Sequence, residues 1–592
     1  MASRRDFLKT AALGGASLAA GTGALAARGA RGRARGARRP NVVLVLTDDQ
    51  GYGDLACLGN PIIQTPNLDR LHGQSTRLTD FHVCPTCAPT RASLMTGRYC
   101  NRTGVWHTIM GRSILRSDEV TMAEAFAASG YRTAIFGKWH LGDSYPYRPQ
   151  DRGFHETLCH GGGGVGQTPD YWGNGYFDDT YWHNGEPAPQ TGYCTDVWFD
   201  GAMDFIARNK ERPFFCYLST NAPHTPLYVD EKYSKPYKDA GVEPEQAAFY
   251  GMIANIDENT GRLMAHLREH GLEDNTILLF ITDNGTGTGF RKGQGYNAGM
   301  RGTKGSEYDG GHRVPCFIRW PGGPIQPGRD VDRLAAHIDI LPSLIELCGL
   351  DTRRTAPFDG RSLAPILTDP AAEWADRALV VDSQRIEHPE QWRKCAVMTQ
   401  RWRLVNGTEL YDMDSDPGQK QDAAAAHGDV VQGLRKAYED WWADTSQRFD
   451  EYCPLTLGAD AENPVRLTCH DWHGPQVPWN QGLIRKGMEA NGFWAVEVAR
   501  QGTYRFELRR WPVELDAPIR SAVDGGVAID ATRARLRVGD TELTEPVDDA
   551  AAAAVFEVAL KPGPARLQTW FEAEGGAPRG AYYVYVTRIE ER

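Results

Sequence analysis

The feature that most constrains the fold is a pair of unbroken apolar runs, residues 42–46 and 277–281, each followed by acidic or amide side chains. Such runs are typical of strands that are buried on both faces, as in the interior of a parallel sheet. Strand-like and helical segments alternate over residues 41–350. This alternation predicts an α/β fold in which a large, mostly parallel sheet is covered by helices.

The length of 592 residues exceeds what one hydrophobic core usually supports, so we expect at least one further domain. From about residue 375 the strand-like runs become shorter, and a helical pattern follows near residues 430–445. Short alternating segments separated by Gly and Pro turns then predict an added β-sandwich over residues 455–592. Residues 159–195 are rich in Gly, Trp, Tyr, Asp and Asn without clean periodicity, which predicts a long loop. Its aromatic side chains suit either stacking on sugar rings or ordinary surface packing.

Polar side chains follow both apolar runs. Asp48 and Asp49 come after the first, and Asp283 and Asn284 after the second. The carboxyl ends of strands are where open α/β sheets bind ligands. A set made only of oxygen donors favours a hard divalent cation, Ca2+ or Mg2+, over zinc. Either pair alone is more often a cap or a turn; both together at buried strand ends predict a metal site.

A cysteine motif lies in residues 84–98, which read as a short loop running into a helix. It consists of Cys87-x-Pro89-x-Arg91, followed in register by Met95-Thr96-Gly97-Arg98. This pattern resembles the signature of the type I sulfatases, whose cysteine is oxidised after translation to formylglycine (3-oxoalanine) and works as the aldehyde hydrate. The resemblance covers about residues 40–450. It implies an alkaline-phosphatase-like fold, with a catalytic domain at 40–370 and a smaller α+β subdomain at 371–450.

The resemblance also implies an activity, the hydrolysis of sulfate monoesters, which we expect on a sulfated small molecule or carbohydrate. Hydrolysis of such an ester needs charge neutralisation, an oxygen nucleophile and a leaving-group acid. The resemblance implies that hydrated formylglycine at Cys87 is the nucleophile, and we expect Arg91, one helical turn later, to stand beside it and hold it or the anion. The remaining implied roles are charge neutralisation by Lys138 and Lys304, protonation of the leaving alcohol by His224 with Lys304, deprotonation of the second hydroxyl by His140, and metal binding by Asp48, Asp49, Cys87, Asp283 and Asn284.

Three other interpretations remain open at this point. Cys84 and Cys87 form a C-x-x-C, which is also the pattern of a redox pair, and a disulfide between them would block conversion of Cys87. A phosphodiesterase or phosphonate monoester hydrolase of the same superfamily can use a similar site. A non-catalytic glycan-binding protein would keep Cys87 as a thiol.

The N-terminus predicts export. Residues 3–9 resemble a twin-arginine motif and precede an apolar, Ala/Gly-rich stretch, so we expect a removed signal peptide at 1–27, an Arg-rich linker at 28–39 and no membrane anchor. The expected destination is the periplasm or the outside of the cell, after a formylglycine-generating enzyme has acted. The formal charge of -11 combines +8 in residues 1–40 with -19 in the rest, which argues against nucleic acid as a partner.

Overall fold

The computed structural model describes residues 39–351, 356–576 and 579–589. The expected signal peptide and nearly all of the Arg-rich linker therefore lie outside the described residues. Within the described part of the chain, no helix combines the length and the apolar character that crossing a membrane requires.

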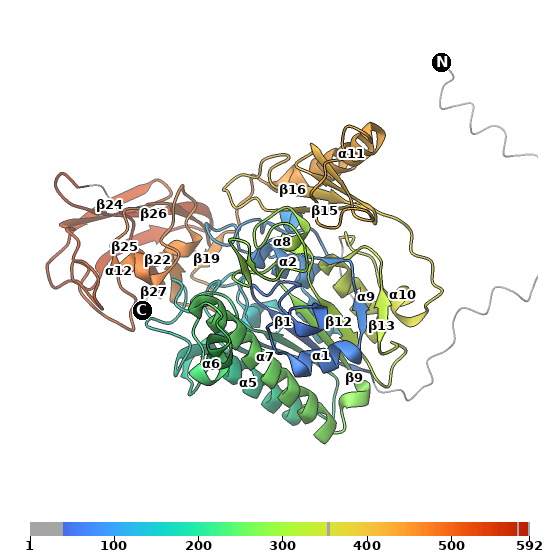
Figure 1. The fold of residues 1–592 in the computed structure, drawn as a ribbon. Helices are drawn as coiled ribbons and strands as arrows, with labels where there is room; N and C mark the ends of the chain where they lie inside the picture. The colour runs from blue at the N-terminus through green and yellow to red at the C-terminus, as the bar shows by residue number, and fades with distance from the viewer. Residues whose placement is uncertain (1–38, 352–355, 577–578, 590–592) are drawn as a thin grey trace, which may run out of the picture. The chain divides into compact units, whose positions relative to one another are not determined.

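A ten-stranded sheet forms the centre of the large domain (Figure 1). Its five central strands, β9, β1, β8, β4 and β5, are mutually parallel. In spatial order the strands are β13 (Arg329–Val331), β2 (Thr76–Leu78), β12 (Cys316–Arg319), β9 (Thr276–Thr282), β1 (Asn41–Thr47), β8 (Phe214–Ser219), β4 (Arg132–Lys138), β5 (Glu156–His160), β6 (Thr180–His183) and β7 (Glu186–Pro189). The prediction of a large, mostly parallel sheet is confirmed.

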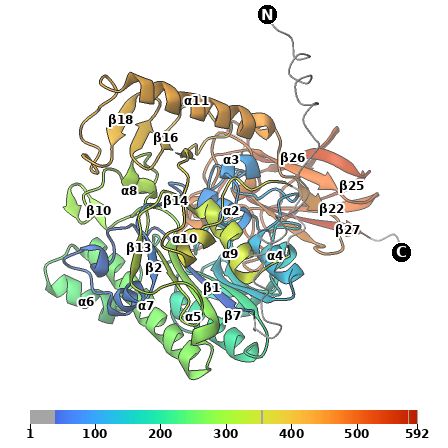
Figure 2. The ribbon, with the colours of Figure 1, turned by 90° about the vertical axis from the view of Figure 1, so that its right-hand side faces the viewer.

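Helices cover both faces of this sheet, as the side chains of β1 illustrate. Val43 and Val45 pack in the core beneath α1 (Pro66–Gly73), α5 (Cys194–Arg208) and α7 (Pro244–Glu269), with α6 (Glu231–Asp239) outside α7. Val42, Leu44 and Leu46 pack in the opposite core. That core is closed by α2 (Cys87–Thr96), α4 (Met122–Ala128), α9 (Ile340–Cys348) and α10 (Ala364–Thr368), which Figure 2 shows grouped together. An unbroken apolar strand is thus the expected consequence of burial on two sides.

A separate four-stranded antiparallel sheet follows in the chain. It consists of β15 (Leu379–Asp382), β16 (Cys395–Met398), β17 (Trp402–Val405) and β18 (Glu409–Asp412). One face packs against α11 (Gly428–Thr445) through Leu434 and Tyr438, and the other packs against Leu334, Ala336 and Ile338 of the large domain. The second face therefore attaches this sheet to the part of the chain that carries α2.

The C-terminal region contains two sheets around one apolar core. The first comprises β19 (Leu455–Leu457), β21 (Phe493–Val498), β26 (Gly563–Glu572), β23 (Arg533–Val538) and β24 (Thr541–Pro546). The second comprises β20 (Val465–Thr468), β27 (Tyr583–Ile589), β22 (Gly502–Arg509) and β25 (Ala554–Leu560), and a short helix, α12 (Gln481–Arg485), precedes β21. The fold class with an added, β-rich C-terminal region agrees with the prediction, while the domain boundaries stay a prediction.

The segment 159–195 corrects one expectation. It is not a loop throughout, because β6 and β7 form a hairpin that extends the main sheet antiparallel to β5. The turn consists of Asn184 and Gly185, both with positive φ, which is the strongest short hairpin signal in a sequence. Trp172 of this segment packs edge-on against Trp511 of the C-terminal region. At least this aromatic residue serves for packing.

Candidate active site

The strand register brings the two acidic pairs together. β1 and β9 are parallel neighbours in which Thr47 pairs with Thr282, so the next residues, Asp48 and Asp283, leave the sheet side by side. The Asp283 amide donates to the Thr47 carbonyl at 3.0 Å, and the Asp49 amide donates to an Asp283 carboxylate oxygen at 3.2 Å. Asp48 and Asp283 are fully buried. The register of these two apolar strands therefore places the Asp48 and Asp283 carboxylates next to each other at one edge of the sheet.

The next two strands supply a lysine and a histidine at the same edge. Lys138 is the last residue of β4, and its Nζ lies 2.6 Å from Asp48 Oδ2. His224 follows β8 in a loop and donates from Nδ1 to the Thr225 carbonyl at 2.6 Å, which leaves Nε2 3.8 Å from Asp49 Oδ2. The Tyr176 hydroxyl donates to the His224 carbonyl at 2.9 Å and so holds this loop.

Cys87 is the first residue of α2, a helix whose residues are all buried. Its Sγ, a carboxylate oxygen of Asp48 and one of Asp283 all lie within 4.8 Å of one another. Arg91 lies one turn later, but it faces the carboxylate. Its Nη2 and Nε lie 2.8 and 3.2 Å from Asp283 Oδ2, and its Nη1 donates to the Lys138 carbonyl and to the Ser219 hydroxyl. With its donors committed in this way, Arg91 orients Asp283.

Lys304 completes the group from the loop before α8 (Asp309–His312). Its Nζ lies 2.6 Å from Asp49 Oδ1, an oxygen that also accepts a hydrogen bond from Asn284 Nδ2 at 2.9 Å. Burial is the largest influence and would raise the pKa of Asp49, but the charges of Lys304 and His224 and the hydrogen bonds from Lys304 and Asn284 together hold that pKa far below its usual range. In return, Asp49 raises the pKa of Lys304 against the effect of burial. Lys304 is therefore a cation at neutral pH.

The two histidines are neutral for a related reason. Burial, followed by the charge of Lys304, lowers the pKa of His224 to about 4. Burial and the charge of Lys138 lower the pKa of His140 well below its usual value. His140 donates from Nε2 to the Thr108 carbonyl at 2.8 Å, and its buried Nδ1 has no hydrogen-bond partner among the described residues. Nδ1 of His140 is thus free to accept a proton.

The donor set fits a hard divalent cation. Asp48 Oδ1 and Asn284 Oδ1 are buried and lack a hydrogen-bond partner within the described ranges. Burial, and next the charge of Asp48, raises the pKa of Asp283 to about 6, since two carboxylates this close repel each other. Buried, converging oxygen atoms with unused lone pairs are what calcium and magnesium sites provide. Asp49 and His140 also have positive φ angles of 65° and 61°, a strained conformation found often at functional sites.

Sequence reasoning missed several residues at this edge. His160 ends β5 just as Lys138 ends β4, and burial, with smaller contributions from the charges of Lys138, Arg91 and His224, lowers its pKa. A histidine at the end of a strand beside β4 was the available signal. His470 comes from the C-terminal region, with its ring centroid 6.2 Å from that of His140, and no local pattern marks it. Ser219, the last residue of β8, is the third such residue.

Cys84 has partners other than Cys87. Its Sγ lies 3.6 Å from Cys100 Sγ and 3.3 Å from His337 Nε2, and both Cys84 and Cys87 are free cysteines. Burial would raise the pKa of the Cys84 thiol, but its hydrogen bond with Cys100 and the charge of His337 lower it to about 5. This arrangement gives no support to a Cys84–Cys87 disulfide.

Asp54 gives a test of how the β1 loop is stabilised. One of its oxygens accepts from the Gly51 amide at 2.8 Å, the other has no hydrogen-bond partner among described residues, and burial raises its pKa to about 7. An unfolded aspartate has a pKa of about 3.9, so the contribution of Asp54 to stability is greatest below that pH and is lost as the pH rises to about 7. We expect Asp54→Asn, which has no charge to bury, to raise the free energy of unfolding by about 2–4 kcal/mol at pH 8 and to change it little at pH 4. Urea unfolding at both pH values measures this, and equal effects at the two would contradict it.

Comparisons with known proteins agree with this geometry. The sequence model of the sulfatase family matches residues 40–350, and that of the C-terminal part of N-sulphoglucosamine sulphohydrolase matches residues 303–441. Human arylsulfatase A is 33% identical over 361 residues, covering 56% of this chain and 68% of that protein. N-acetylgalactosamine-6-sulfatase from Canis lupus familiaris is 31% identical over 365 residues, covering 57% and 67%. Among solved structures, Ps i-CgsB in complex with k-i-k-neocarrahexaose matches with a TM-score of 0.62 and 26% identity, over 70% of this chain and 95% of that one.

The fold and the gathered strand-end side chains define a hydrolase of the alkaline phosphatase superfamily. Within it, the chain belongs to the sulfatase family, because the family model covers more than half of its length. It is accordingly a sulfuric ester hydrolase.

Proposed function

We propose that this protein hydrolyses a sulfate monoester with a formylglycine derived from Cys87 and a divalent cation held by Asp48, Asp49, Asp283 and Asn284. The observation that carries the proposal is the position of Cys87 Sγ, within 4.8 Å of the Asp48 and Asp283 carboxylates at the carboxyl edge of the sheet. The nucleophilic atom and the charge that activates it must be neighbours for this chemistry.

The cation would supply Lewis acidity toward the ester oxygens and favour ionisation of the nucleophile. We propose Ca2+, with Mg2+ as the alternative, because the buried oxygen donors described above suit either ion. The side chain at position 87 would be the fifth ligand. The formylglycine hydrate would supply two hydroxyl groups, one to attack sulfur and one to release the product.

The lysines neutralise the substrate's charge. Lys138 and Lys304 are held against Asp48 and Asp49 respectively, which fixes both cations beside the proposed cation site. Preorganised charges of this kind favour a transition state in which negative charge moves onto the leaving oxygen. Arg91, committed to Asp283, acts as a positioning residue.

Proton transfer is divided among three groups. At neutral pH the proton lies on Lys304, while the nearby His224 is neutral, so in our proposal Lys304 supplies the proton that the pair passes to the departing alcohol. His140, with a free Nδ1, takes the proton from the second hydroxyl and so allows release of sulfate.

The test begins with mass spectrometry of tryptic peptide 78–91, which contains both Cys84 and Cys87. In protein made with a formylglycine-generating enzyme, we expect a loss of about 18 Da at Cys87, the difference between a thiol and an aldehyde side chain. The same preparation should hydrolyse an aryl sulfate faster than an aryl phosphodiester. An unmodified Cys87 in active protein, or a preference for the phosphodiester, would overturn the proposal.

We further propose a sulfated carbohydrate as the substrate. A cavity of about 670 Å³ lies between the large domain and the C-terminal region, lined among others by Trp139, His160, Trp182, Glu462 and Arg466. His160, which lines the cavity, pairs with Lys138 in the register of β5 and β4, so the cavity adjoins the site. Aromatic faces, carboxylates and a guanidinium around one cavity suit a sugar ring and its hydroxyl groups. The complex of Ps i-CgsB with k-i-k-neocarrahexaose adds support.

Trp182 gives a test of the carbohydrate proposal. It lines the cavity and carries the Arg466 guanidinium 4.6 Å from its ring centroid. We expect Trp182→Ala to raise KM for a sulfated oligosaccharide about 5- to 10-fold, the equivalent of one lost aromatic contact, without changing kcat/KM for a small aryl sulfate. Trp570→Ala is the matched control, because Trp570 also carries an arginine, Arg535 at 3.9 Å, but lies on β26. Equal losses on both substrates would contradict a sugar-binding role.

We also propose export by the twin-arginine pathway, which the Arg4-Arg5 pair and the apolar stretch behind it support. That pathway carries folded protein, so conversion of Cys87 by the formylglycine-generating enzyme and binding of the metal would both precede export. The proposed domains are the signal peptide at 1–27, the linker at 28–39, the catalytic domain at 40–370, the α+β subdomain at 371–450 and the β-sandwich at 455–592.

A further inference from the structure

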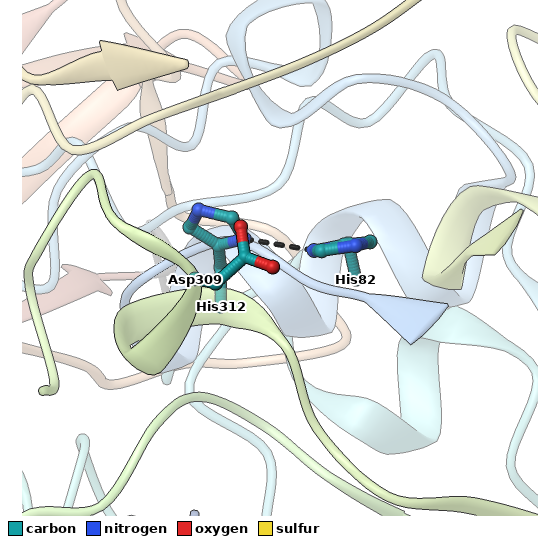
Figure 3. Close-up of side chains that lie close together, drawn as sticks. All are labelled: His82, Asp309 and His312. Atoms are coloured by element: carbon teal, nitrogen blue, oxygen red, sulfur yellow. Dashed lines mark hydrogen bonds between the residues drawn. The ribbon is translucent and has the colours of Figure 1, made fainter. Parts of the chain in front are cut away.

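A second cluster of metal-ligand side chains lies outside the active site. His82 ends β3 (Phe81–His82), and Asp309 and His312 are the first and last residues of α8. All three are fully buried. Figure 3 shows the two imidazole rings directed at each other, with the Asp309 carboxylate beside them; His82 Nδ1 and His312 Nδ1 are 2.9 Å apart. None of these residues has a part in the mechanism proposed above.

The partners of the other ring nitrogens fix both tautomers. His82 Nε2 lies 2.8 Å from Asp80 Oδ1, and His312 Nε2 lies 3.2 Å from the Glu307 carbonyl oxygen. A carboxylate and a carbonyl only accept hydrogen bonds, so each Nε2 must carry the hydrogen. Each Nδ1 of a neutral ring is then a bare lone pair. Two lone pairs at 2.9 Å repel each other unless a cation lies between them.

Arg403 does not remove this repulsion. Its Nη2 approaches His82 Nε2 at 3.3 Å, but the same nitrogen donates to Asp80 at the shorter distance of 2.9 Å, and its Nε donates to Asp309 Oδ1 at 3.1 Å. The Arg403 guanidinium therefore donates its hydrogen bonds to the Asp80 and Asp309 carboxylates. Asp309 Oδ2 is buried and has no hydrogen-bond partner in the described part of the chain, so a third lone pair is also unused.

We propose that His82, His312 and Asp309 bind a divalent transition-metal ion of the zinc class. The three ligand atoms lie within 4.8 Å of one another. Imidazole and carboxylate ligands together are typical of zinc and its neighbours, in contrast to the all-oxygen set of the active site. With bonds of about 2.0–2.1 Å around a tetrahedral ion, the two nitrogens would move apart by about 0.4 Å. Asp80 on His82 is the carboxylate–histidine partner that such sites commonly have.

The position of this site suggests what the ion does. The Val83 amide donates to the His312 carbonyl at 2.9 Å, and the Gly305 amide donates to the Pro85 carbonyl at 2.8 Å. The segment carrying Cys87 and the loop carrying Lys304 thus already run together. An ion bound by His82 and His312 joins the same two segments and fixes the spacing between the nucleophile and Lys304. Through Arg403 it is also linked to β17.

The experiment measures metal in untagged, full-length protein. The protein is stripped with a chelator, saturated with Ca2+ to fill the active-site carboxylates, exposed to Zn2+ and dialysed. We expect about one zinc per chain by elemental mass spectrometry in the wild type and none in His312→Gln. His266→Gln changes a histidine on α7, away from the cluster, and is the control variant that should keep the bound zinc. Asp80→Asn should bind zinc about 10- to 100-fold more weakly, as loss of an imidazole's carboxylate partner does.

If His312→Gln does not fold, X-ray absorption spectroscopy of the zinc-loaded wild type tests the proposal instead. We expect two imidazole ligands at zinc. Absence of retained zinc in the wild type would overturn the proposal and leave a proton as the occupant between the two rings. A spectrum with oxygen ligands alone, or unchanged zinc content in a folded His312→Gln, would overturn it as well.

Discussion

Cys87→Ala is expected to lower kcat/KM for an aryl sulfate by at least about 10,000-fold, because alanine offers neither a thiol for conversion nor any nucleophile. The effect should fall on kcat, since the cations that hold the substrate, Lys138 and Lys304, are held by Asp48 and Asp49 and not by Cys87. Initial rates at saturating Ca2+ measure it. A residual rate within 10-fold of wild type would rule out position 87 as the nucleophile.

Two further variants sharpen this prediction. Cys87→Ser, produced without conversion, can attack sulfur but has no second hydroxyl to expel the product, so we expect a stable adduct of about 80 Da and no turnover. Cys84→Ala is the control for losing a thiol from the same loop. Because Cys84 contacts Cys100 and His337, we expect it to keep turnover once Cys87 is converted. Turnover by protein with an unconverted Cys87 thiol, lost in Cys84→Ala, would favour the redox interpretation.

The fold was largely predictable from the chain because its central strands are buried on both faces. The apolar run at residues 277–281 lies within β9 (Thr276–Thr282), and the helical pattern near residues 430–445 lies within α11 (Gly428–Thr445). Edge strands were less predictable. The hairpin of β6 and β7 mixes polar and aromatic residues, and β24 is exposed along its whole length, so neither shows a strong pattern. Burial, the main source of periodicity, is weak at these edges.

The candidate site was predictable where its residues follow strands and unpredictable where it depends on long-range contacts. Asp48 and Asp283 could be paired in advance, since parallel strands end at one edge. Spacing alone gave only part of the position of Arg91: one helical turn from Cys87 places it near the nucleophile, and Cys87 is among the groups that raise its pKa. The hydrogen bond from its guanidinium to Asp283, 192 positions along the chain, has no local signal. The His82–His312 pair is separated by 230 positions and has no local signature. The tautomers of these two histidines and their unused lone pairs can be assigned only from the positions of their hydrogen-bond partners.

Asp283→Ala is expected to lower the free energy of unfolding by about 3–5 kcal/mol, the usual cost of removing one partner from a buried ion pair. The cause is Arg91, which is fully buried and whose Nε and Nη2 both donate to Asp283. The same change removes a carboxylate from the proposed cation site, so activity at saturating Ca2+ should also fall, by at least about 1,000-fold. Urea unfolding and Ca2+-dependent initial rates measure the two effects.

A double variant separates the two roles of Asp283. Replacing both partners by apolar residues, in Arg91→Met with Asp283→Leu, removes the unpaired charge, and such replacements are often close to neutral. We expect the double variant to recover at least half of the lost stability while activity and Ca2+ affinity stay lost. Stability would then depend on the pairing of Arg91, and catalysis on the carboxylate itself. If activity returned together with stability, Asp283 would act only as a counter-ion for Arg91, and the proposed cation site would have to be built from the remaining oxygens.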